Sequence, residues 1–283
     1  MNNKIISIWI VCSLVIGGIL LYAHQISLET RAETWSTEIV DSSGDVGRDS
    51  SIVVDSSGYP HISYHDSIND NLKYARWTGS EWNIETVDNN GGVGRYTSIA
   101  LDNAGNPHIS YYDWTNGDLK YARWTGSIWN IIIVDSTNDT GYYTSIALDD
   151  SDYPHISYFD DSSRDLKYVK WTGSDWIIEI VDGTGYMGLY TSIALDNSGY
   201  GCIGYQDRDN CDLKFARWNG SEWNIETVDS AGDVGQYTSL ALGSHGYPII
   251  SYRDVTNGDL KLATFSSLSG TFGFEVFLPV VIR

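Results

Sequence analysis

Short runs of alternating apolar and polar residues, bounded by turn-forming residues, fill most of the chain after its N-terminal segment. In one stretch such runs cover Thr97–Asp102, His108–Asp113, Leu119–Trp124 and Trp129–Asp135. A period of two places successive side chains on opposite faces of a strand. The connecting segments are short and rich in glycine, asparagine and threonine, which favour tight turns. The pattern therefore predicts four antiparallel strands in this stretch.

The four-strand unit repeats every 47 residues without insertion or deletion. The tryptophan that opens its last strand recurs at Trp35, Trp82, Trp129, Trp176 and Trp223. The residue that ends its third strand recurs at Trp77, Trp124, Trp171, Trp218 and Phe265. Tandem four-stranded units of about 40–50 residues are typical of β-propeller blades. An open β-solenoid is the alternative, although its rungs are usually shorter and lack a four-strand meander. We predict an all-β five-bladed β-propeller of four-stranded antiparallel blades over residues 30–283, preceded by an N-terminal hydrophobic helix.

Two segments match the last strand of the fifth blade. The N-terminal segment Trp35–Asp41 has the pattern of that strand but is preceded by no other strand of its unit. A C-terminal strand at about 272–282 begins with a similar pattern. Pairing of either one with the fifth blade would close the ring and remove an exposed edge. The sequence does not decide between them.

Residues 1–29 contain a nearly uninterrupted apolar run, from Ile5 to Ala23, with Lys4 as the nearby cation. Its length is close to the roughly 20 residues that a membrane-spanning helix needs. A cleaved signal peptide and an uncleaved N-terminal membrane anchor both fit this run. In either case we expect the rest of the protein to be exported, either secreted or anchored to the outer face of the cell membrane.

The composition is acidic and aromatic. The formal net charge is −20, from 37 acidic and 17 basic residues, and the chain contains 20 tyrosines and 11 tryptophans. A strongly negative field repels phosphate backbones, so nucleic acid is excluded as the expected partner. The charge fits an extracellular surface, a calcium-rich or salty medium, or a cationic partner.

Several residues recur in all five copies and are expected to be structural. The serines are Ser51, Ser98, Ser145, Ser192 and Ser239; the tyrosines are Tyr64, Tyr111, Tyr158, Tyr205 and Tyr252. The glycines Gly47, Gly94, Gly141, Gly188 and Gly235 are expected to bend the backbone into each first strand. A lysine near the start of each third strand, such as Lys120, faces an aspartate that ends the second strand, such as Asp113. We expect an ion pair within each hairpin; a fivefold cationic binding ring is the alternative.

Metal and catalytic sites have weaker support. Aspartates such as Asp113 and Asp118 recur five residues apart, so calcium is an open alternative to turn capping. The histidines His61, His108 and His155 recur at one strand position on separate blades, so we predict packing and no metal site. No Ser-His-Asp arrangement and no catalytic motif is present, so we predict no catalytic residues. Cys202 and Cys211 lie too far apart in the repeat for a disulfide and are expected to be free thiols.

The blade pattern resembles several propeller families. Ile99-Ala100-Leu101-Asp102 is similar to the blade opening of NHL-type propellers. His108–Tyr112, with Leu119, Trp124 and Trp129, resembles blades of fucose-binding propeller lectins, which hold sugar between blades with an arginine, a glutamate and an aromatic residue. In this chain Ile109 or Ser110 stands at the arginine position, and Lys120 or Asp118 at the glutamate position. Five 47-residue blades also resemble lectins of the tachylectin-2 type. The blade architecture is similar to that of sialidases, but this chain lacks the sialidase sequence boxes.

Repetition favours a binding function because equivalent blades give several weak sites that act together. We predict a surface or secreted carbohydrate-binding, lectin-like propeller without a required cofactor. The predicted ligand-binding aromatics are Tyr96, Trp114, Tyr143, Tyr190 and Tyr237, near the loops of one face. Packing at the start of each first strand is the alternative role for the tyrosines. A protein-interaction or structural surface propeller is the second hypothesis, and a glycoside hydrolase or lyase of sialidase-like fold the third.

Overall fold

The computed structural model describes residues 35–265. Two compact units divide the chain, Met1–Ile39 and Val40–Arg283, and the second contains every described strand. The apolar segment 5–23, the predicted N-terminal helix and the predicted C-terminal strand lie outside the described residues. Residues 35–265 contain no helix, and hence none long and apolar enough to cross a membrane.

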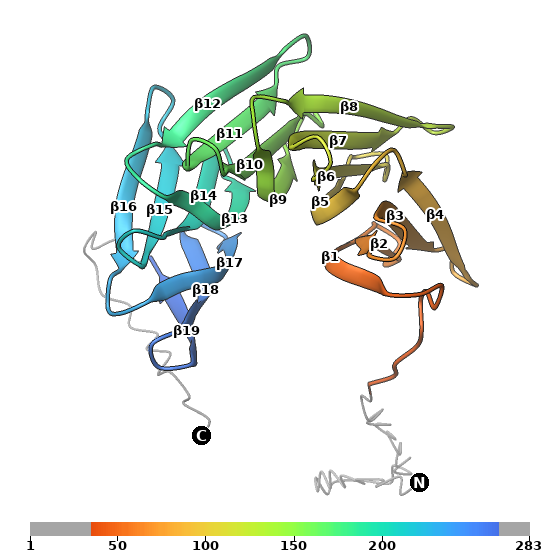
Figure 1. Cartoon of the computed structure of the whole chain (residues 1–283), viewed down its shortest axis with the longest axis horizontal. Helices are drawn as coiled ribbons and strands as arrows, with labels where there is room; N and C mark the ends of the chain where they lie inside the picture. The colour runs from red at the N-terminus through yellow and green to blue at the C-terminus, as the bar shows by residue number, and fades with distance from the viewer. Residues whose placement is uncertain (1–34, 266–283) are drawn as a thin grey trace, which may run out of the picture. The chain divides into compact units, whose positions relative to one another are not determined.

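The described strands form five antiparallel sheets, which we number I to V in chain order (Figure 1). Sheet I contains β1 (Val46–Val54), β2 (Pro60–Asp66), β3 (Asn71–Trp77) and β4 (Trp82–Asp88). Sheet II contains β5 (Val93–Leu101), β6 (Pro107–Asp113), β7 (Asp118–Trp124) and β8 (Trp129–Asp135). Sheet III contains β9 (Thr140–Leu148), β10 (Pro154–Asp160), β11 (Asp165–Trp171) and β12 (Trp176–Asp182). Sheet IV contains β13 (Met187–Leu195), β14 (Gly201–Asp207), β15 (Asp212–Trp218) and β16 (Trp223–Asp229). Sheet V contains β17 (Val234–Leu242), β18 (Pro248–Asp254) and β19 (Asp259–Thr264).

Each sheet is a four-strand meander, as the repeat predicts, except that sheet V has three strands among the described residues. The all-β class and the four-stranded antiparallel sheets are thus confirmed. The predicted strand at Trp35–Asp41 is wrong for this structure, because these residues form no strand. No described strand pairs with this segment, and the sequence pattern alone does not make a strand.

The first strands start earlier than predicted because each contains a bulge. β5 begins at Val93 rather than Thr97, and its register against β6 shifts on both sides of Arg95. Gly94 has φ +94°, and a Cβ there would lie 2.7 Å from the Cα of Leu72 in sheet I. The repeated glycine is therefore required both by its backbone angle and by the close approach of the preceding sheet.

The core lies between successive sheets. Leu72 and Val87 of sheet I form one buried cluster with Val93, Ile99 and Tyr111 of sheet II. First strands of neighbouring sheets pack together, β1 against β5, β5 against β9, and so on to β17. The repeated serines link them: the Ile99 amide donates to Ser51 Oγ at 3.2 Å, and the same bond joins Ile146 to Ser98. This confirms a structural role for that serine position.

Buried ion pairs also join the sheets, in addition to the expected ion pair within the hairpin, which forms in sheets II to V. Lys120 Nζ donates to Asp88 of the preceding sheet at 2.5 Å and lies 3.8 Å from Asp113 in its own hairpin. Asp88 also accepts the hydroxyl of Tyr111 at 2.7 Å. Equivalent sets are Asp41/Tyr64/Lys73, Asp135/Tyr158/Lys167, Asp182/Tyr205/Lys214 and Asp229/Tyr252/Lys261. In four of the five sets, the lysine lies closer to the aspartate that ends the preceding sheet than to the aspartate of its own hairpin. Lys167 is the exception, because it lies 2.7 Å from Asp160 in its own hairpin and 3.3 Å from Asp135.

Apolar side chains on the outer faces of sheets I and V are more exposed than the equivalent side chains of the other sheets. Ile52 of β1 is 63% exposed, whereas Ile99 at the same position of sheet II is 6% exposed. Leu260 of β19 is 84% exposed, whereas Leu72 at its position in sheet I is fully buried. These are the two faces that have no neighbouring sheet among the described residues.

Candidate functional site

The sheets have two ends at which side chains of neighbouring sheets meet. We call the end with the turns between first and second strands, such as 102–107, the turn end. We call the end with the loops between second and third strands, such as 114–117, the loop end. A cavity lies at the turn end between sheets I and II, and the predicted aromatic residues lie at the loop end.

The cavity between sheets I and II has a volume of about 720 Å³. Strands β3 and β4 contribute Arg76 and Glu85 to its lining. Sheet II contributes Trp124, Trp129 and the turn 102–107. Arg76 and Glu85 face the cavity together because β3 and β4 are adjacent strands of one hairpin. We call this space the I/II cavity.

The indole of Trp129 is held rigidly in the I/II cavity. Its Nε1 donates to Glu85 Oε2 across the sheet boundary at 3.0 Å. The ring of Tyr74 meets it edge-on, with 5.3 Å between ring centroids. Tyr74 is itself fixed, because its hydroxyl lies 2.6 Å from Nδ1 of His61. Trp124 packs against Trp129 from the facing strand, at 5.5 Å. The cavity therefore has a preformed aromatic wall.

Arg76 brings an uncommitted charge to this wall. Its guanidinium forms no hydrogen bond or ion pair with any residue in 35–265, although it is close enough to His61 to lower the pKa of that histidine, after the larger effect of burial. Glu85 is engaged by Trp129 and by the amide of Asn83 at 3.1 Å. The cavity thus offers guanidinium donors beside a carboxylate and two indoles.

The space equivalent to the I/II cavity is lined by different side chains between the other sheets. Cavities of about 220 and 320 Å³ lie between sheets IV and V, lined by Phe215, Glu226 and Phe265, with Arg217 at the second. Arg217 is engaged there, because its Nη2 donates to the Gly246 carbonyl at 2.6 Å. Between sheets II and III, Ile132 replaces the glutamate. Sheets III and IV keep the indole bond, from Trp223 to Glu179 at 3.0 Å, but have Lys170 in place of the arginine.

The structure brings four of the five predicted aromatic residues together. Tyr96, Tyr143, Tyr190 and Tyr237 form a continuous ladder across sheets II–V, with centroid separations of 4.7, 4.7 and 4.6 Å. All four have φ between +53° and +54°, a left-handed conformation that is costly for a bulky residue. Tyr237, at the end of the ladder, is 62% exposed. Burial and the neighbouring phenols raise the pKa of Tyr143 and Tyr190 to about 12, so both are neutral.

Trp114 lies apart from the ladder, on the loop of sheet II. Its indole is 44% exposed and lies beneath the guanidinium of Arg95, which is 4.8 Å from the ring centroid. Gly92 makes room for it, because a Cβ at Gly92 would overlap the indole nitrogen. None of the five residues is tested as a ligand contact by these observations, and their role in binding stays a prediction.

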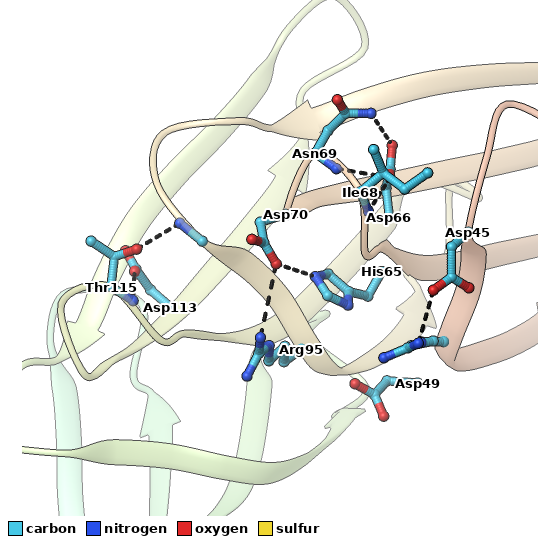
Figure 2. A network of polar contacts seen from close by, with 12 residues as sticks. Asp45, Asp49, His65, Asp66, Ile68, Asn69, Asp70, Arg95, Asp113 and Thr115 are labelled. Atoms are coloured by element: carbon cyan, nitrogen blue, oxygen red, sulfur yellow. Dashed lines mark hydrogen bonds and ion pairs between the residues drawn. The ribbon is translucent and has the colours of Figure 1, made fainter.

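The loop aspartates cap turns. Asp66 accepts the backbone amides of Ile68 and Asn69 and the side-chain amide of Asn69, as Figure 2 shows. Asp113 does the same in sheet II, for Thr115 and Asn116. Residues 35–265 contain no group of three or more histidine, cysteine, aspartate or glutamate side chains placed to hold a metal ion.

The repeated histidines are buried in a structural chain of contacts. His108 accepts the hydroxyl of Tyr121 at 2.6 Å through Nδ1 and has Asp102 at 3.6 Å from Nε2. Burial lowers the pKa of His108 to about 4. The sulfur of Cys202, which stands at this position in sheet IV, accepts Nε of Arg217 at 3.3 Å.

Comparison with known proteins identifies the fold alone. No family model matches the sequence, and no curated protein matches it. A protein of unknown function from Dyadobacter fermentans has a TM-score of 0.55 at 11% identity, with 79% of this chain and 84% of that chain covered. An ulvan lyase, in complex with a glucuronate–sulfated rhamnose saccharide, has a TM-score of 0.51 at 16% identity, with 75% and 65% covered. A Hadza microbial sialidase has a TM-score of 0.51 at 12% identity, with 76% and 56% covered. The chain therefore spans less than two thirds of the lyase and of the sialidase.

Sequence reasoning missed Arg76 and Glu85. The resemblance to fucose-binding lectins directed attention to residues 109–110 and 118–120, whereas Arg76 and Glu85 lie on the hairpin β3–β4. The repeat contained the signal: a cation recurs at Arg76, Arg123, Lys170 and Arg217, and a glutamate at Glu38, Glu85, Glu179 and Glu226. Only the structure shows that Arg76 and Glu85 line one cavity against the neighbouring sheet.

Proposed function

We propose that this protein is an exported five-bladed β-propeller that binds carbohydrate in the I/II cavity. The observation that carries the proposal is the free guanidinium of Arg76 beside the fixed indoles of Trp124 and Trp129. Preformed pockets with aromatic walls and a few directed polar groups are typical ligand sites. The volume of about 720 Å³ is in the range that holds a small saccharide.

The lining matches the chemistry of a pyranose ring. The apolar C–H face of a sugar packs against an aromatic ring, and its hydroxyl groups both donate and accept hydrogen bonds. Arg76 supplies donors in a planar fork, and Glu85 supplies an acceptor with a remaining lone pair. Because the donor is uncommitted in the free protein, binding breaks no protein contact.

The proposed site is unequal around the repeat. Only the I/II cavity combines a free arginine, a glutamate and two tryptophans among the described sheet boundaries. The smaller cavities between sheets IV and V have Arg217 already engaged. We therefore expect one principal site with weaker additional ones, rather than five equal sites.

A glycan array probed with the protein, with and without calcium, tests the proposal. We expect saturable binding to a restricted set of glycans that quenches tryptophan fluorescence, because two indoles form the wall. Dependence on calcium would assign a ligand role to the loop aspartates. An array with no bound glycan under either condition would overturn the proposal and favour a protein partner.

Export and ring closure belong to the same proposal. The apolar run 5–23 supports export, as a cleaved signal or as an anchor at the outer face of the membrane. The exposed faces of β1 and β19 support a closed five-bladed ring, since each presents the apolar side chain that its equivalents bury between sheets, Ile52 and Leu260. Closure would pack these faces together.

A further inference from the structure

The residues that break the repeat gather at the loop end. One position reads His65, Tyr112, Phe159, Gln206 and Arg253, different in every sheet. The position after the second strand reads Ser67, Trp114, Asp161, Arg208 and Val255, also different in every sheet. The first four residues of the first row are at most 3% exposed. The same backbone surrounds each of them, so packing alone would be satisfied by one residue type in all sheets.

Polar atoms in this region lack partners. Ser67 Oγ, Thr140 Oγ1 and Gln206 Oε1 form no hydrogen bond with residues 35–265, and all three lie at the loop end, whereas His65 Nε2 lies 3.3 Å from Asp70 Oδ1. His65, Thr140 and Gln206 are at least nine-tenths buried. A buried polar group without a partner costs about 1–3 kcal/mol. Such groups at the loop end can bind a polar ligand; one further unpartnered atom, His108 Nε2, lies at the turn end.

Two guanidinium groups at this end lie over aromatic rings. Arg95 lies over Trp114 at 4.8 Å, and Arg164 lies over Tyr186 at 5.3 Å. Arg164 has no hydrogen bond or ion pair from its side chain to any residue in 35–265. Arg95 faces only Asp70, at 3.9 Å, too long for a hydrogen bond (Figure 2). These cation–π contacts hold each guanidinium beside a ring and engage none of its N–H donors, which can therefore bind carboxylate or sulfate oxygens.

An aromatic path connects the two arginines. Tyr112 packs against Tyr142 at 4.3 Å, and Phe159 packs against Tyr186 at 5.2 Å. Tyr142 and Phe159, 6.3 Å apart, join these two pairs. The nearby carboxylates are engaged: Asp139 accepts both tyrosine hydroxyls, and Asp161 accepts the hydroxyl of Tyr186 at 3.1 Å. The uncommitted groups along the path are therefore cationic donors.

We propose that the loop end of sheets II–IV binds an acidic oligosaccharide, whose carboxylate or sulfate groups are held by Arg95 and Arg164. Sugar rings between these groups lie against Tyr142 and Tyr186, the half-buried rings of the path. This site is at the opposite end of the sheets from the I/II cavity and does not depend on it. Since the net charge of −20 repels polyanions, binding has to come from these local contacts.

Titration of the full protein with an oligogalacturonate, a sulfated dextran and a neutral dextran tests this site. The first probe carries carboxylate groups and the second carries sulfate groups, so together they show which group is bound. Binding of either acidic probe, with no binding of the neutral dextran, supports the site. We expect Arg95→Gln and Arg164→Gln each to weaken this binding about tenfold or more, with unchanged thermal unfolding because neither side chain has a hydrogen bond to lose. Arg95→Lys should not restore binding, because an ammonium lacks the planar fork.

Arg123→Gln, at the turn end of sheet II, is the matched control and should leave acidic-saccharide binding unchanged. Equal binding of neutral dextran, no binding of either acidic probe, or affinities unchanged in both loop-end variants would overturn the proposal. Loss of binding in Arg76→Gln alone would assign acidic saccharides to the I/II cavity and would also overturn it.

Discussion

Removing the cation of one inter-sheet ion pair should destabilise the protein strongly. The side chains of Lys120 and Asp88 are 7% and 5% exposed and lie 2.5 Å apart. At an effective dielectric constant of about 20, two unit charges at this distance attract by about 6–7 kcal/mol before desolvation is subtracted. In Lys120→Met the Asp88 carboxylate would keep only neutral partners, the hydroxyl of Tyr111 and the backbone amide of Asn90. Breaking one side of a buried pair typically costs about 3–5 kcal/mol, and we expect a loss in that range.

Urea denaturation followed by tryptophan fluorescence measures this loss, with Arg48→Met as the control. Arg48 forms an exposed ion pair with Asp45, at 2.8 Å, and should contribute less than about 1 kcal/mol. The double variant Asp88→Asn/Lys120→Met should recover part of the loss, because it removes the stranded charge. If Lys120→Met were no less stable than Arg48→Met, the ion pairs would not be joining the sheets as described.

Two further predictions concern acid and ring closure. Stability should fall in two stages on acidification. Burial lowers the pKa of His108 in the folded state to about 4, from about 6.5 in the unfolded chain. The unfolded chain therefore takes up a proton first, and the free energy of unfolding decreases as pH falls from about 6.5 toward 4. Despite burial, hydrogen bonds from Thr137 and Tyr158 lower the pKa of Asp135, so its contribution to stability is lost only below about pH 4. Equal urea midpoints at pH 7 and pH 5 would contradict the first stage. Leu260→Asn should cost about 2–4 kcal/mol if sheets V and I pack together as the other successive sheets do, whereas a change within about 0.5 kcal/mol in urea denaturation would show that Leu260 stays at the surface.

The repeat made most strand positions predictable. Predicted and observed strands agree at Trp129–Asp135 and differ by one residue at His108–Asp113, because each is a short alternating run between turn residues. The early start of β5 was not predictable, since the bulge at Gly94 arises from the approach of Leu72 in another sheet. The alternation of apolar and polar residues within one strand predicts that strand, but it does not predict which residues of another sheet will contact it.

The same limit explains the sites. The ion pair of Lys120 with Asp113 was predictable because both lie in one hairpin, whereas its closer pair with Asp88 joins it to the preceding sheet and was not. The tyrosines at Tyr96 and its equivalents were found by their position near the loops, but their ladder depends on a left-handed backbone that composition does not reveal. Arg76 and Glu85 face one cavity only because two sheets meet there.

Isothermal titration of wild-type protein and Arg76→Met with the best glycan from the array tests the central claim most directly. Arg123→Met, at the equivalent position of sheet II where Ile132 replaces the glutamate, is the matched control. We predict saturable binding by the wild type and by Arg123→Met, and at least a tenfold loss of affinity in Arg76→Met with unchanged thermal stability. Unchanged affinity in Arg76→Met would contradict a carbohydrate site in the I/II cavity.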